Sequence, residues 1–250
     1  MEQKSRQQET ISFRELPFSE LIKRDRRLAE LRREYSRGTP EERRQAAEWA
    51  YDESVANRLF NRGLVLAGQE SAVQEPWPDG IAALAIDPAY APAMLTVGSI
   101  EYQLGRRDEA TTLFHGLLML PTDTPELEVI IDKAGDYLLS EKDFERAADL
   151  YAAASAIFPA STAILAGLAY CLGKLKRLAE SVIVQRRALA LDPNNYHLLN
   201  DLGWALTESG QFDEAEALLE KAMELAPPGD DLARNNLEEA RRRSEPPHLR

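Results

Sequence analysis

The stretch YHLLNDLGWALTESGQFDEAEALLEKAMELAPPG, residues 196–229, decides the fold of this chain. Its pattern recurs upstream in the same phase, so that Pro159, Pro193 and Pro227 follow one another at steps of 34 residues. Other positions keep the same step, namely Ile131, Leu165 and Leu199, then Gly135, Ala169 and Gly203, then Ala154, Ala188 and Ala222. A repeat of this length predicts stacked helix pairs, because one pair cannot bury its apolar face alone.

The units resemble the tetratricopeptide repeat, whose pattern is W-x-x-L-G-x-x-Y, then A-x-x-x-F, then P. In residues 196–229 these slots hold Leu199, Leu202, Gly203, Leu206, Ala215, Leu219 and Pro227. The resemblance covers 91–124, 128–161, 162–195 and 196–229, with Pro125, Glu126 and Leu127 as an insertion. The unit 162–195 departs from the pattern at Ser181 and Gln185. The resemblance implies an all-α fold, a right-handed α-solenoid of stacked helix pairs.

Close packing explains the residue types. Small residues such as Gly98, Gly135 and Gly203 let the first helix of a pair, helix A, approach the second, helix B. Each repeat proline ends helix B, because proline lacks an N–H and disfavours helix in the residue before it. Asp108 and Asp213 are predicted to cap the starts of their B helices.

The two ends of the chain differ from the repeats. Residues 1–38 form a basic arm with an amphipathic helix from Phe18 to Arg37, which either caps the solenoid or engages a partner, another copy of the chain, or an anionic membrane surface. Residues 39–90 are expected to hold a long helix, begun by a capping box at Thr39-Pro40-Glu41-Glu42, and a degenerate repeat in which Trp77 pins a loop. A capping helix is predicted over 230–243 and a loose tail over 244–250.

Charge and cysteine content narrow the class of protein. The net charge is −12, of which residues 1–44 contribute +3, from twelve Lys and Arg against nine Asp and Glu. Acidic repeats are poor nucleic-acid binders, because phosphate neutralisation supplies most of the non-specific affinity. The single Cys171 gives no internal disulfide and is expected to pack between helices.

Targeting segments are not evident in the sequence. Residues 1–30 are charged and lack the apolar core of a signal peptide, so a cytoplasmic location is expected. Residues 151–173 carry no charge, but Pro159 places a turn between two repeats there, which argues against a membrane span.

Catalytic motifs are missing as well. The chain has no P-loop, no G-x-S-x-G, no H-E-x-x-H and no dinucleotide fingerprint. His115, His197 and His248 are far apart and have no carboxylate or cysteine at ligand spacing. We expect no enzyme, no cofactor and no metal.

The family resemblance also implies a binding face, because helix A of each repeat generally lines a concave groove. Carried onto this sequence, that face is predicted to present Tyr102, Asp132, Asp136, Tyr170, Lys174, His197, Asn200, Trp204 and Glu208, with Ser99, Val129, Lys133 and Asp201 at further positions. The carboxylate clamp of the family needs Lys or Arg and Asn where this chain has mainly acids, aromatics and small residues. A basic and apolar segment of another protein is the expected ligand.

The leading hypothesis is a non-catalytic adaptor or chaperone-like subunit that binds a partner segment in this groove. A structural subunit that oligomerises or docks through the basic N-terminal helix is the alternative. An enzyme or a regulator of small-molecule chemistry carries little weight.

Overall fold

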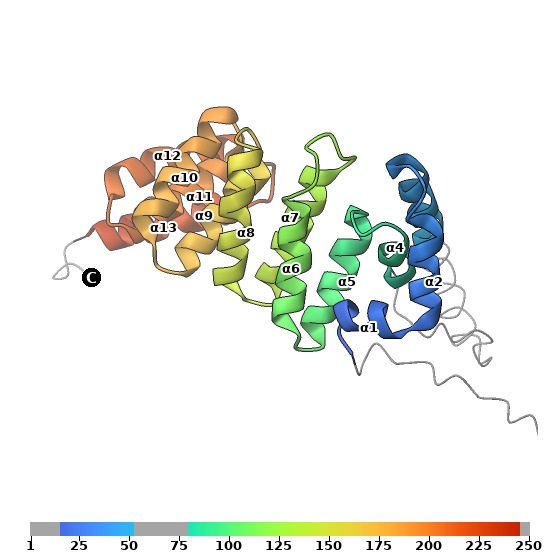
Figure 1. Ribbon diagram of the computed structural model, residues 1–250. Coiled ribbons are helices and arrows are strands. Elements are labelled where there is room, and N and C mark those ends of the chain that lie inside the picture. The colour runs from blue at the N-terminus through green and yellow to red at the C-terminus, as the bar shows by residue number, and fades with distance from the viewer. Residues whose placement is uncertain (1–15, 53–79, 246–250) are drawn as a thin grey trace, which may run out of the picture. The chain divides into compact units, whose positions relative to one another are not determined.

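The computed structural model describes residues 16–52 and 80–245, and every regular element in these two ranges is a helix (Figure 1). The predicted all-α fold of consecutive helix pairs is therefore confirmed for the described part of the chain. Contacts divide the chain into two compact units, Met1–Ile131 and Asp132–Arg250, with the boundary inside helix α7 (Leu127–Ser140).

The first unit combines the N-terminal helices with the first complete repeat. Its elements are α1 (Phe18–Arg24), α2 (Arg26–Tyr35), a helix over 40–52, α4 (Ile81–Ile86), α5 (Ala91–Gln103) and α6 (Arg107–Leu117). Helix α2 packs on α1 and α4, and α5 packs on α4 and α6. Of the degenerate repeat predicted within 39–90, Trp77 and its loop lie outside the described residues, but α4 ends two residues before Pro88, as the repeat pattern predicts.

The capping box predicted at residue 39 is confirmed. The backbone N–H of Glu42 donates to Thr39 Oγ1 over 3.2 Å, and the backbone N–H of Thr39 donates to Glu42 Oε2 over 2.8 Å. Two backbone N–H groups at the start of the helix are thereby hydrogen-bonded to the side chains of residues three apart in sequence. These bonds lower the pKa of the Glu42 carboxyl.

Helix α1 is bonded to the first repeat through a buried carboxylate. The backbone N–H of Phe18 donates to Glu101 Oε1 over 2.6 Å, Ser19 Oγ donates to Glu109 Oε1 over 2.9 Å, and Arg106 pairs with Glu101. Burial raises the pKa of Glu101, although the hydrogen bonds from the Phe18 N–H and Arg106 act to lower it. Leu21 and Leu28 are 0% exposed, so the apolar side of the N-terminal helices faces the core of this unit.

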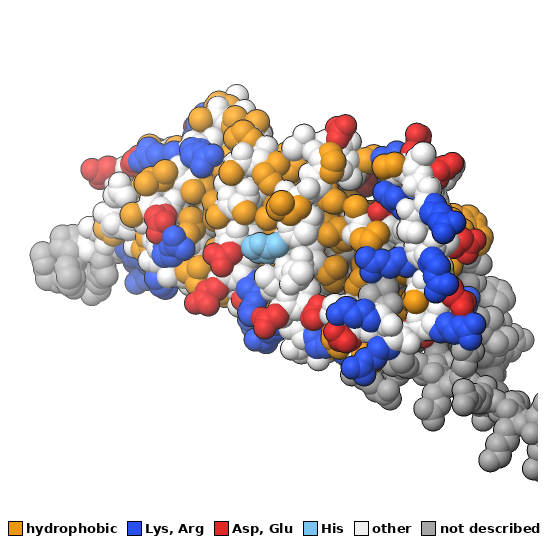
Figure 2. Space-filling view, in the orientation of Figure 1, with side chains coloured by type: hydrophobic (Ala, Val, Ile, Leu, Met, Phe, Trp, Pro, Cys, Tyr) orange, Lys and Arg blue, Asp and Glu red, His pale blue; other side chains and the backbone are white. Residues whose placement is uncertain are grey.

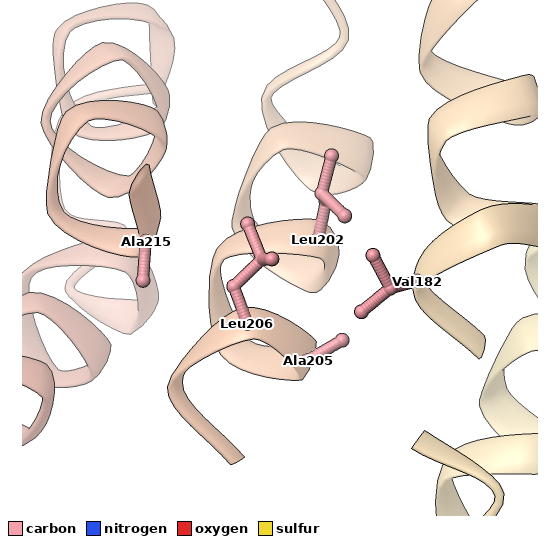
Figure 3. Packing of buried hydrophobic residues seen from close by; sticks show 5 residues of the cluster. All are labelled: Val182, Leu202, Ala205, Leu206 and Ala215. Carbon is pink, nitrogen blue, oxygen red and sulfur yellow. The ribbon is translucent and has the colours of Figure 1, made fainter. Parts of the chain in front are cut away.

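The second unit consists of consecutive helices from the C-terminal part of α7 to α13. After α7 come α8 (Phe144–Ile157), α9 (Thr162–Lys174), α10 (Leu178–Leu191), α11 (Tyr196–Glu208), α12 (Phe212–Leu225) and α13 (Leu232–Ser244). From α8 to α12, each helix packs on the next one in the chain. The last helix, α13, packs on both α11 and α12. One core cluster is formed by Val182 of α10, Leu202, Ala205 and Leu206 of α11, and Ala215 of α12 (Figure 3).

The helix boundaries follow the repeat punctuation. Helices α8, α10 and α12 each end two residues before Pro159, Pro193 and Pro227. Helix α6 ends at Leu117, which leaves a longer connection to α7 and places the predicted insertion there. The final helix begins at Leu232, whose N–H donates to Asp230 Oδ1 over 3.0 Å, and ends with three arginines in its last turn, as a capping helix should.

The prediction that Asp108 and Asp213 cap their helices is wrong. The residues at the cap positions of α6 and α12 are Arg106 and Gln211, and neither helix has a side-chain cap bond. Both aspartates instead lie within the first turn, where a carboxylate still interacts favourably with the helix dipole. The predicted cap positions lie two residues after the observed ones.

Two helix-A glycines show why the repeat requires small residues. A Cβ added at Gly203 would lie 2.6 Å from Leu219 Cγ, and one at Gly98 would lie 2.6 Å from Phe114 Cε1. Both distances are shorter than carbon atoms tolerate, so any larger residue would push helix B away.

Cys171 is buried, as predicted, and burial raises the pKa of its thiol to about 12. In the ranges 16–52 and 80–245, no helix is long and apolar enough to cross a bilayer.

Candidate protein-binding groove

A groove of about 490 Å³ opens in the second unit between α9 and α11 and is closed at one end by α13. Its floor comes from α10. The lining residues are Ala169, Tyr170, Gly173, Lys174, Lys176, Leu178, Ser181, Gln185, Asn200, Asp201, Trp204, Ala205, Glu208, Leu232 and Asn236. Space of this volume accommodates several side chains of a bound segment.

The α9 wall presents an aromatic ring and a cation. Tyr170 is 49% exposed, and its ring meets that of Phe144 edge to face at 6.4 Å. Lys174 Nζ lies 4.9 Å from the centroid of the Tyr170 ring, a cation–π distance. The ring is therefore held from its edge and one face while part of it remains accessible.

The α11 wall is held by side chains of the capping helix. Arg243 lies over the Trp204 ring at 5.3 Å and donates to Glu208 Oε1 and to Glu239 Oε1, each over 2.6 Å. These bonds raise the pKa of Arg243, and the hydrogen bonds from Arg242 and Arg243 lower the pKa of Glu239 to about 2. The Trp204 indole is thus held by a guanidinium that is itself hydrogen-bonded to two carboxylates.

Asn200 links the same wall to α13. Its Oδ1 accepts from Asn236 Nδ2 over 2.8 Å, and its Nδ2 donates to Asp201 Oδ1 over 3.2 Å. Desolvation raises the pKa of Asp201, although the residue is exposed. Both polar groups of Asn200 are engaged by the protein.

The floor is polar and uncharged. Ser181 Oγ donates to the backbone carbonyl of Ala169 over 2.8 Å. Gln185 is 6% exposed, and within the part of the chain that the structure describes its Oε1 is buried with no hydrogen-bond partner. Buried acceptors are normally paired, so this oxygen is an exception that needs a reason.

The sequence of the third repeat differs from that of the other repeats at the position of Gln185. Where α10 has Gln185, the corresponding helix-B residues are Phe114, Tyr151 and Leu219, all of which are at most 1% exposed. These three side chains pack against the helix-A glycines Gly98, Gly135 and Gly203. The third repeat has Ala169 in place of the glycine and a polar side chain in place of the apolar one.

Five of the predicted partner-binding residues come together in this groove: Tyr170, Lys174, Asn200, Trp204 and Glu208. Asp201, a further predicted position, lines it as well. The helix-A periodicity therefore assigned these side chains to a common face.

The other predicted residues lie elsewhere. Tyr102 belongs to the first unit, where it is 5% exposed and lies beneath the Arg107 guanidinium. Asp132 and Asp136 accept from the Tyr151 hydroxyl, their Oδ1 atoms lying 3.2 and 3.1 Å from it. His197 is exposed at the start of α11, with its ring 3.9 Å from that of Tyr196.

Sequence reasoning predicted the capping helix but did not assign its residues, or those of the floor, to the groove. Ser181 and Gln185 were visible as departures from the repeat pattern, which was the available signal. Lys176, Leu232 and Asn236 carried no such signal, because they come from a loop and from a helix outside the repeats. No group of three or more metal-ligating side chains occurs in the described ranges 16–52 and 80–245.

Residues 161–227 and 138–183 match two family profiles, both described as tetratricopeptide repeat. Residues 138–227 therefore match the tetratricopeptide repeat. No curated protein is similar enough to the chain to match it.

Several solved tetratricopeptide structures are similar to the chain. The Sgt2 TPR domain from Aspergillus fumigatus is 25% identical over 50% of this chain and 87% of its own, with a TM-score of 0.45. YrrB, titled a TPR protein with an unusual peptide-binding site, is 19% identical over 64% of this chain and 80% of its own, with a TM-score of 0.49. PilF of Pseudomonas aeruginosa is 17% identical over 80% and 89%, with a TM-score of 0.46.

Proposed function

We propose that the second unit is a protein-interaction scaffold, an adaptor that holds a segment of another protein in the groove between α9, α11 and α13. One observation carries the proposal: a groove of about 490 Å³ has an aromatic ring on each wall, Tyr170 and Trp204. Aromatic side chains in concave, well-packed sites dominate the affinity of most protein interfaces.

The charges of the groove favour an apolar and largely uncharged segment. Glu208 is already paired with Arg243 at 2.6 Å and with Lys176 at 3.5 Å. Lys174 and Lys176 line the same space and repel a cationic ligand. Of the acids that line the groove, only Asp201 is left to attract a cationic ligand. We therefore propose a less basic ligand than the sequence predicted.

The test uses peptides selected from a displayed random library on the full chain. Trp204→Ala is expected to weaken their binding by about 2 kcal/mol, or roughly thirtyfold, because the variant removes a wall of the groove. Tyr170→Ala should act in the same direction. Ile183→Ala is the matched control, because Ile183 is 60% exposed on α10 and does not line the groove.

Titration by fluorescence anisotropy measures the dissociation constants. Peptides that bind Trp204→Ala and Tyr170→Ala as tightly as the wild-type chain would overturn the proposal.

A second candidate uses the first unit, where Lys and Arg side chains cover the exposed side of α2 (Figure 2). This basic surface is the part of the N-terminal arm that remains for docking or self-association, because Leu21 and Leu28 are buried. Charge reversal at Arg32 and Arg33, both exposed, tests it without uncovering the core. A mass measured by light scattering that does not depend on concentration or on these charges would exclude self-association through α2.

A further inference from the structure

We propose that the floor of the groove, formed by Gln185 with Ser181 beside it, selects partner segments that insert a side-chain carboxamide, Asn or Gln. This inference rests on the proposed function and names the chemistry that the groove recognises.

The first step is that Gln185 does not serve the packing of its own helix pair. Its position in the repeat corresponds to that of Leu219 in the fourth repeat, and Leu219 is 0% exposed. Gln185 Oε1, by contrast, is buried without a hydrogen-bond partner among the described residues. An unpaired buried carbonyl costs stability, whereas an apolar residue of similar size would not. A ligand that donates to this oxygen removes the cost.

The second step is that the donor is neutral. The floor residues Ser181 and Gln185 carry no charge, and Lys174 and Lys176 line the same groove. A buried cation needs a paired anion, but Glu208 is already bonded to Arg243 and Lys176, and Asp201 is exposed on the α11 wall rather than on the floor. An ammonium or guanidinium inserted to the floor would therefore lose its hydration without a carboxylate on the floor to pair with.

The third step separates a carboxamide from a hydroxyl. Gln185 presents a carbonyl oxygen and an NH2 group in one plane, so a second carboxamide can donate to the one and accept from the other. A hydroxyl both donates and accepts, but from a single oxygen, so it cannot make two parallel bonds to the oxygen and the NH2 group of Gln185. The match also holds if the Gln185 amide is turned by half a rotation, because a carboxamide carries both functions.

The experiment begins with the peptides selected on the full wild-type chain from a displayed random library. We expect one position of the groove-dependent peptides to be enriched in Asn and Gln. Replacing that residue by Leu should weaken binding to the wild-type chain about tenfold or more, because the buried acceptor is left unpaired.

The protein variant for this test is Gln185→Leu, and Gln211→Leu is its control, because Gln211 is exposed and lies outside the groove. Gln185→Leu should weaken the carboxamide peptides about tenfold and restore the Leu-substituted ones, since the two changes remove both members of one hydrogen-bonded pair. Thermal unfolding of Gln185→Leu should not occur at a lower temperature than that of the wild type, because Leu packs at this position in α12.

The outcomes separate the two proposals. If Trp204→Ala and Tyr170→Ala weaken binding but Gln185→Leu does not, the groove stands and carboxamide selection is wrong. If Gln185→Leu lowers the unfolding temperature, Gln185 is structural and the inference is also overturned. If no selected peptide depends on Tyr170, Trp204 or Gln185, the proposed function fails with it.

Discussion

Helices α8 and α10 carry different side chains at the same position of the repeat. In α8 the residue is Tyr151, which is 0% exposed and packs its ring against Gly135 and Gly167. Its hydroxyl is bonded to two aspartates, and burial raises its pKa. In α10 the residue is Gln185, which lines a groove and whose buried Oε1 is unpaired among the described residues. A large side chain with a satisfied polar end holds helices together, whereas an unsatisfied one leaves a place for another molecule.

Replacing Tyr151 should have the largest effect on stability. Tyr151→Ala is expected to lower the free energy of unfolding by about 3 to 5 kcal/mol, because a fully buried aromatic ring is lost and a cavity remains. Tyr151→Phe keeps the ring and loses the hydroxyl contacts, so it should cost only about 1 kcal/mol. Guanidinium unfolding followed by circular dichroism measures both. Equal losses for the two variants would show that the hydroxyl, and not the ring, holds α8 in place.

Glu101 offers the opposite case to Gln185, because it is a buried polar side chain in the first unit with its partners present. Glu101→Ala is expected to cost about 2 to 3 kcal/mol, since the Phe18 N–H and the Arg106 side chain lose a charged acceptor. Trypsin should then cut more readily near Lys23 as α1 detaches. Glu109→Ala is the control, because among the contacts that join α1 to the repeat this carboxylate accepts only the side chain of Ser19. Unchanged proteolysis in Glu101→Ala would mean that α1 is held in place without the bonds to Glu101.

Two glycines of helix A sharpen the contrast between the fourth and third repeats. Gly203→Ala should cost about 1 to 3 kcal/mol, because its Cβ would lie 2.6 Å from Leu219 Cγ. Gly173→Ala should instead stabilise by about 0.5 to 1 kcal/mol, because its Cβ would meet only Ser181 Oγ, at 3.8 Å, and alanine favours helix. Thermal unfolding distinguishes the two signs. A loss of stability in both variants would show that the third repeat is packed as tightly as the fourth.

Much of the fold could be predicted, because the evidence for it is local. The prolines at 159, 193 and 227 ended their helices where expected, and the capping box at Thr39 formed as its four residues require. The two aspartates predicted as caps are not caps, because the caps of α6 and α12 lie two residues before them.

By itself, the sequence determined that this chain is a stack of helix pairs and that Tyr170, Asn200 and Trp204 share a face, because both follow from residue spacing along helices. Only the tertiary structure decided that Arg243 covers Trp204, that Asn236 bonds Asn200, and that the acids at 132 and 136 are bonded to Tyr151. It also showed that Gln185 Oε1 lacks a partner in the described residues. The physical reason is that a hydrogen bond or a ring contact depends on atoms placed within a few ångströms by helices far apart in sequence, and residue spacing within one repeat carries no information about the neighbouring side chain.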